Sequence, residues 1–323
     1  MGMAKNPDSG RKVGENEPSV PPSGNEGDRT SLRRSIRRRL KSRDDRAKPS
    51  PEPTATPCQP ITYSRDLPRV SPAEAPHAPP GPHANLTDLV TGTDVQAPDG
   101  GHVFLIDTPI VTLDPKWREL CDSLLRSFRT EESPLRRHLA GLCENAPALG
   151  DVMFLDLETT GLGSSPLFLI GTMVWADDCL LVRQYFARDY SQERAAVSMF
   201  LQAMAGKTLL VSFNGKSFDL PYVRVRAAAT GLAFNIQAAH MDLLHISRRA
   251  WGHSLSDCRL QTLERIICGR LRTGDIPGNL IPQAYHDYVR TGNATQMADC
   301  LRHNMLDLVT LADLATRLPM PEV

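Results

Sequence analysis

The chain has 323 residues with 37 basic and 37 acidic side chains, so its formal net charge is zero and no global field attracts a polyanion. Its seven cysteines are an odd number without a Cys-x-x-Cys pair, which indicates neither a disulfide framework nor a zinc site. No apolar stretch approaches the roughly 20 residues of a membrane span, and the first residues lack an apolar signal core. These features predict a soluble, cytoplasmic protein with no membrane partner.

The first 84 residues differ in composition from the rest. Fifteen of the chain's 26 prolines lie in residues 1–84, and few large apolar residues accompany them, which predicts a disordered tail. Within it, residues 29–48 carry ten basic and two acidic side chains, and Leu32, Ile36 and Leu40 recur every four residues. This segment is expected to form a short basic helix on a polyanion, with nucleic acid as the favoured partner. The alternative is a solvated tail with incidental arginines.

Two folded regions are expected after the tail. Residues 85–149 are predicted to form an N-terminal extension, with turns and short strands over 86–107 and a helix over 116–128. Residues 150–318 are predicted to form the main domain.

Three successive strands are predicted at the start of the main domain, over residues 152–157, 167–175 and 180–186. Short turns join them, so they should form an antiparallel meander. Asp156 and Glu158 lie two residues apart at the end of the first strand, and side chains at that spacing point to one face. A carboxylate in an apolar strand is costly unless it is paired or bound to a cation. These two side chains are therefore candidate metal ligands.

A helix over residues 191–204, with Ser191 as its cap, and a buried strand over 209–213 come next. A strand that follows a helix in this way is expected to return parallel to the first strand. The sheet should therefore be mixed.

The stretch Asn214-Gly-Lys-Ser217 follows that strand. It does not fit the phosphate-loop pattern, because that pattern requires a glycine where position 210 is Leu. Asp219 is expected to begin a helix that runs to about residue 230, with Asn214 and Lys216 in the loop above the metals. Lys216 is a candidate contact for a substrate phosphate, and a solvated loop lysine is the alternative.

The last part of the chain is predicted to be helical after a short edge strand over residues 241–244. Asp242 on that strand is a candidate fifth metal ligand, and local hydrogen bonding is the alternative. The last helix carries His303 and Asp307. The closing helices are expected over residues 260–267, 281–290 and 295–317.

Four carboxylates, those of Asp156, Glu158, Asp219 and Asp307, would form one ring if their segments converge. Cleaving a phosphodiester requires an activated water and stabilised charge on the entering and leaving oxygens, which two cations about 4 Å apart can provide. Mg²⁺ and Mn²⁺ prefer oxygen ligands. The pattern therefore predicts a nuclease site that binds two ions of Mg²⁺ or Mn²⁺.

The acidic clusters lie in the motifs DLETTG, NGKSFD and HNMLD, in that order. This trio resembles the DEDD exonucleases of the ribonuclease-H-like superfamily. The stretches DIPGNLIP at 275–282 and YVRTG at 288–292 are similar to the YprB-type bacterial branch, and the resemblance runs from residue 86 to residue 318. It implies an α/β fold with a ribonuclease-H-like mixed sheet flanked by helices, preceded by the disordered tail.

The third motif departs from the pattern of the superfamily. That pattern has a Tyr four residues before the Asp or a His five residues before it, whereas His303 stands four residues before Asp307. Residues four apart share a helix face, so His303 should still lean towards the cation bound by Asp307. A histidine there can orient or deprotonate the attacking water. The alternative is a helix histidine that only hydrogen-bonds its neighbours.

The resemblance also implies contacts to the substrate. The residues that match Thr159, Thr160 and Leu162 lie against the terminal nucleotide in the superfamily, with Leu162 against its base, and a plain turn is the alternative. The predicted activity is metal-dependent 3′–5′ exonuclease hydrolysis of nucleic acid, with DNA in repair or processing as the favoured substrate. A helicase or other repair protein is an expected partner. A nucleic-acid-binding adaptor that keeps the fold without turnover is the alternative function.

Overall fold

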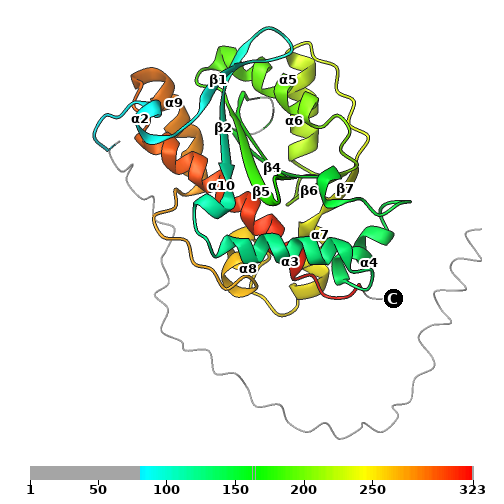
Figure 1. Cartoon of the computed structure of the whole chain (residues 1–323). Coiled ribbons are helices and arrows are strands. Elements are labelled where there is room, and N and C mark those ends of the chain that lie inside the picture. Colours follow the sequence, from blue (N-terminus) through cyan, green and yellow to red (C-terminus); the bar gives the residue numbers. More distant parts are fainter. Residues whose placement is uncertain (1–80, 162, 164, 322–323) are drawn as a thin grey trace, which may run out of the picture. The chain divides into compact units, whose positions relative to one another are not determined.

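The computed structural model describes residues 81–161, 163 and 165–321 (Figure 1). The predicted disordered tail up to residue 80, the basic segment 29–48 and Leu162 lie outside the described residues.

A seven-stranded mixed sheet lies at the centre of the described part, in the order β1-β2-β5-β4-β3-β6-β7. The first five strands in that order pair antiparallel, and β6 and β7 continue the sheet parallel to β3. The predicted meander and the parallel return are therefore confirmed. The strands are β1 (Thr93–Gln96), β2 (His102–Pro109), β3 (Val152–Thr159), β4 (Leu167–Ala176), β5 (Cys179–Phe186), β6 (Leu209–Ser212) and β7 (Ala239–Asp242).

Helices cover both faces of the sheet, as Figure 1 shows. Apolar side chains of α5 and α6 pack on one face, and those of α3, α4, α7, α8 and α10 pack on the other. A third cluster joins α2, α9 and the first half of α10 to β2, β4 and β5. The described α-helices are α2 (Leu86–Leu89), α3 (Trp117–Arg129), α4 (Pro134–Ala140), α5 (Glu193–Ala203), α6 (Asp219–Ala229), α7 (Leu243–Trp251), α8 (Leu260–Ile266), α9 (Ile281–Thr291) and α10 (Thr295–Thr316).

Strand β3 separates the two apolar layers because its side chains alternate. Val152 and Phe154 belong to the cluster on the α10 side, whereas Met153 and Leu155 belong to the cluster beneath α5 and α6. Side chains two residues apart share a face, so the side chains of Asp156 and Glu158 also point to the α10 side of the sheet. The sheet thus directs the first acidic pair towards the last helix.

Two local predictions are wrong. Asp189, not Ser191, caps the turn before α5: its side chain accepts a hydrogen bond from the Ser191 amide, and a 3-10 turn (Tyr190–Gln192) precedes the helix. The edge strand ends at Asp242 instead of continuing to residue 244. The Asp242 carboxylate accepts the Leu244 amide and begins α7, a helix that the sequence analysis did not predict.

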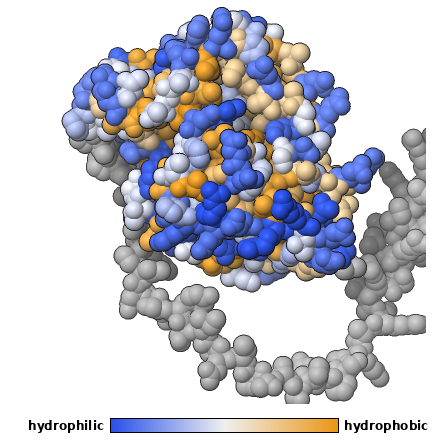
Figure 2. Space-filling view, viewed as in Figure 1, coloured by the Kyte–Doolittle hydropathy of each residue, from blue (hydrophilic) through white to orange (hydrophobic). Residues whose placement is uncertain are grey.

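The space-filling view shows strongly hydrophilic side chains gathered over the face on which α3 lies, with apolar side chains between them (Figure 2). Among the residues that the structure describes, no helix combines the length and the apolar character needed to cross a membrane.

Candidate active site

Asp156 is held against the last helix by an amide. The Nδ2 atom of Asn304 donates to the Asp156 carboxylate at 2.8 Å and to the Asp156 backbone carbonyl at 3.1 Å. Gln184 in turn donates to the Asn304 carbonyl oxygen at 2.8 Å. Gly171 lies opposite Asp156 on β4, and a Cβ atom there would overlap the Asn304 amide. A glycine at this position therefore allows α10 to approach the sheet.

Asp219 lies at the first residue of α6 and is 5% exposed. Its carboxylate accepts the backbone N–H of Leu157, so it lies beside the end of β3. Strands β3 and β6 are parallel, and the loop that follows β6 brings Asp219 to the same edge of the sheet. A negative side chain in the first turn is also favoured by the helix dipole.

The loop before Asp219 is held by Asp242. One Asp242 oxygen accepts the Asn214 amide at 2.8 Å, and the other accepts the Lys216 amide at 3.1 Å. Asn214 has a left-handed backbone with φ of 65°. These contacts favour the local hydrogen-bonding alternative for Asp242 over a fifth metal ligand. The side chains of Asn214 and Lys216 are exposed at this edge.

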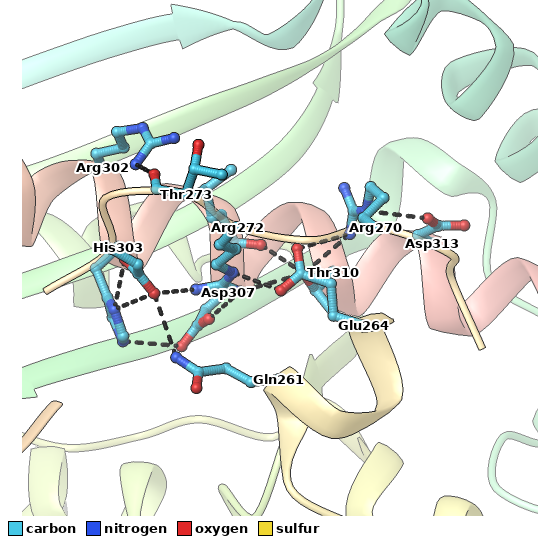
Figure 3. Close-up of polar contacts among 12 residues, drawn as sticks. Gln261, Glu264, Arg270, Arg272, Thr273, Arg302, His303, Asp307, Thr310 and Asp313 are labelled. Atoms are coloured by element: carbon cyan, nitrogen blue, oxygen red, sulfur yellow. Dashed lines mark hydrogen bonds and ion pairs between the residues drawn. The ribbon is translucent and has the colours of Figure 1, made fainter. Parts of the chain in front are cut away.

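Asp307 and His303 lie one turn apart on α10 and contact each other, as Figure 3 shows. The Nε2 atom of His303 is 3.5 Å from Oδ2 of Asp307. The other Asp307 oxygen, Oδ1, is 2.5 Å from Nη2 of Arg272. Both oxygens of Asp307 therefore face a nitrogen atom of a neighbouring side chain.

The four carboxylates are close enough to perturb one another. Burial raises the pKa of Asp156 well above its usual value, and the charge of Asp307 is the next largest cause. The same two causes, in the same order, raise the pKa of Glu158. Burial also raises the pKa of Asp219 to about 7. Carboxylates that are crowded and removed from water are stabilised when they bind a proton or a cation. The oxygen atoms of these four side chains therefore suit a hard divalent metal.

The side chains are not oriented around a common point. Among the described residues, no group of three or more His, Cys, Asp or Glu side chains is arranged so that it could hold a metal ion. Asp156 faces the Asn304 amide and Asp307 faces Arg272. The residue types fit a hard divalent cation such as Mg²⁺ or Mn²⁺.

The residues after Glu158 form a bonded turn. Thr159 donates to the carbonyl of Gly161 at 2.8 Å, and Thr160 donates to the carbonyl of Pro166 at 3.0 Å. Tyr222 on α6 donates to the carbonyl of Ser165 at 2.6 Å and fixes the far side of this turn. These contacts are those expected of a plain turn, the alternative to nucleotide binding. They keep both threonines next to Glu158 at the end of β3.

Three residues of the site were missed in the sequence analysis. Asn304 lies inside the third motif, on the buried face of α10 between Leu301 and Leu308, where a polar residue interrupts an apolar stripe. This polar residue in an apolar stripe is the sequence signal from which a role for Asn304 could have been predicted. Arg272 and Asp275 lie in the segment between α8 and α9, and no periodic pattern marks them.

The comparisons with known proteins agree with this architecture. The family model of the RNase_H superfamily matches residues 153–319, more than half of the chain. The uncharacterized protein YprB of Bacillus subtilis (strain 168) is 33% identical over 184 residues, which cover 54% of this chain and 44% of YprB. The chain thus matches less than half the length of that relative.

A solved structure was also found to be similar. The family B DNA polymerase from the hyperthermophilic archaeon Pyrobaculum calidifontis matches with a TM-score of 0.42 and 17% sequence identity, over 51% of this chain and 24% of the polymerase. The family match and the relative decide the assignment: the chain belongs to the RNase_H superfamily and is a YprB-type ribonuclease-H-like protein.

Proposed function

We propose that the chain is a divalent-metal-dependent 3′–5′ exonuclease of the DEDD type that hydrolyses phosphodiester bonds in DNA during repair or processing. The observation that carries the proposal is the convergence of four carboxylates from β3, α6 and α10, three of which have a raised pKa through burial. Burying such a cluster costs free energy unless bound cations compensate its negative charge.

The four carboxylates would hold two ions of Mg²⁺ or Mn²⁺. The ions would supply charge stabilisation for the entering and leaving oxygens of the phosphodiester. His303 lies beside Asp307 and would orient or deprotonate the attacking water through its ring nitrogen. Thr159 and Thr160, with Leu162, would lie against the terminal nucleotide, and Asn214 and Lys216 would contact its phosphates.

A nucleic-acid-binding adaptor without turnover is the second candidate. It is favoured by the ion pair between Arg272 and Asp307, because a guanidinium already compensates the charge of the proposed ligand. For the enzyme, a helicase or other repair protein would be the partner that supplies single strands.

The test is hydrolysis of end-labelled DNA and RNA oligonucleotides, single-stranded and duplex, with Mg²⁺, with Mn²⁺ and with a chelator. We expect shortening from the 3′ end only when metal is present. Asp156→Asn and Asp307→Asn should each abolish turnover, because each removes a charge that would bind a cation. The matched control is Asp299→Asn, an exposed carboxylate on the same helix as Asp307.

Each outcome selects one candidate. Full activity in either active-site variant would contradict the two-metal proposal. Oligonucleotide binding without shortening in any metal would instead support the adaptor. Loss of about 10² in turnover is expected for His303→Ala if its ring acts on the water.

A further inference from the structure

Two charged side chains from the segment between α8 and α9, those of Arg272 and Asp275, close a ring with His303 and Asp307. Arg272, His303 and Asp307 are labelled in Figure 3. Arg272 reaches Asp307 with Nη2 at 2.5 Å and Asp275 with Nη1 at 3.3 Å. The Nδ1 atom of His303 is 3.1 Å from each oxygen of Asp275. The Nε2 atom of the same ring is 3.5 Å from Asp307. Each carboxylate thus lies between two nitrogen-bearing side chains, and all four side chains are at most 14% exposed.

The contact with Asp275 sets the orientation of the His303 ring. A carboxylate accepts hydrogen bonds from a ring N–H, and both Asp275 oxygens lie 3.1 Å from Nδ1. With Nδ1 held there, the other ring nitrogen, Nε2, faces Asp307 at 3.5 Å. The geometry therefore turns Nε2 towards the acidic cluster, the side on which substrate would bind.

Asp275 is itself held in place. Its Oδ2 atom receives hydrogen bonds from Gln261 at 3.2 Å and from Arg272 at 3.3 Å. Arg272 is anchored in turn by Glu264 at 2.5 Å. A histidine whose partner is fixed from several sides has one ring orientation, and outer partners of this kind tune the ring that they hold.

We propose that Asp275 is a positioning residue for His303: it holds Nδ1 and turns Nε2 towards Asp307. The inference rests on the proposed hydrolysis and names a residue that acts through the histidine, with no direct contact to substrate. Arg272 and Gln261 serve it by fixing the Asp275 carboxylate.

The kinetic test compares kcat and KM for metal-dependent hydrolysis of an end-labelled oligonucleotide. Asp275→Asn should lower kcat by about 10- to 100-fold with KM nearly unchanged, because an amide keeps only one of the two oxygens that hold Nδ1 and can turn its NH2 group towards the ring instead. In a His303→Ala background the same change should have no further effect. Asp275→Glu, which keeps the acceptor, should restore part of kcat.

The matched control is Asp313→Asn. Asp313 lies on the same helix and pairs with Arg270, which belongs to the same segment between α8 and α9. It does not touch His303, so its loss should leave kcat unchanged. Circular dichroism of each variant checks that the fold is kept.

A second readout does not depend on activity. Nitrogen-15 NMR of the full chain, labelled at histidine, detects a ring N–H that a hydrogen bond protects from exchange with water. We expect a protected Nδ1–H of His303 in the wild type and in Asp275→Glu, and its loss in Asp275→Asn.

The outcomes separate this inference from the proposed function. Wild-type kcat in Asp275→Asn, an equal loss in the His303→Ala background, or the absence of a protected Nδ1–H in the wild type would each overturn the positioning role. A wild type that hydrolyses nothing would overturn the proposed function, and the NMR spectra would still decide whether Asp275 holds the ring.

Discussion

The amide of Asn304 is the contact that joins α10 to the first acidic strand. It donates to Asp156 and accepts from Gln184, both at 2.8 Å, and it is fully buried. Asn304→Ala leaves the buried Gln184 amide and the half-buried Asp156 carboxylate without this partner, so we expect a loss of about 1–3 kcal/mol in the free energy of unfolding. Urea denaturation measures it. Asn235→Ala removes an exposed amide and should change stability by less than about 0.5 kcal/mol, and equal losses in the two variants would contradict the role assigned to Asn304.

His240 gives a pH dependence whose sign follows from its burial. Burial lowers the pKa of His240 to about 4, and its ring is 2.7 Å from the Ser212 hydroxyl. Between about pH 4 and pH 6.5 the unfolded chain binds a proton that the folded chain does not. The contribution of His240 to stability is therefore complete above pH 6.5 and is lost as the pH falls towards 4.

The comparison with a variant isolates this contribution. His240→Gln keeps a hydrogen-bonding side chain and removes the titration, so its stability should fall less than that of the wild type between pH 6.5 and 4. Parallel urea midpoints for the two proteins across that range would contradict the prediction.

At the scale of elements, the approach of α10 to β4 depends on Gly171. A Cβ atom at this position would overlap the Asn304 amide, whereas a Cβ atom at Gly150 would meet nothing within 4 Å. Gly171→Ala should therefore destabilise the fold by about 1–3 kcal/mol through overpacking. Gly150→Ala should change stability by less than about 0.5 kcal/mol. Thermal and urea unfolding measure the stability of both variants. If Gly171→Ala leaves the free energy of unfolding unchanged, α10 can shift to make room for the added Cβ atom.

Elements with a strong apolar pattern could be predicted, and short capped helices could not. Strands β3, β4 and β5 are long apolar runs bounded by turn residues, and their antiparallel order follows from their short connections. Helix α7 was missed because the apolar residues after Asp242 also suit a strand. A side-chain cap decides between them, and that contact becomes visible only in the folded chain.

At the scale of the whole molecule, the sequence could predict which residue types converge but not how they are oriented. The acidic clusters stand out because carboxylates are costly in apolar segments. The ring around His303 is different, because Arg272 and Asp275 are brought to α10 by a connecting segment without periodicity. The partner of a charged loop residue is set by tertiary packing, so neither the Arg272 contact with Asp307 nor the Asp275 contact with His303 could be predicted.

The last prediction concerns the basic segment 29–48, which lies outside the described residues. Removing residues 1–80 should leave kcat at saturating substrate nearly unchanged, weaken nucleic-acid binding and flatten its salt dependence, because fewer counterions are released. The cut belongs at 80 because Ala84 and Pro82 hydrogen-bond to Asn293 and Thr295 beside α10. Filter binding over a series of salt concentrations measures the slope.

A variant that keeps the full length but replaces the ten basic residues of the segment with Gln is the control for length, and it should match the truncated protein in affinity and salt dependence. If the truncated protein keeps the affinity and slope of the full chain, the basic segment does not bind the substrate.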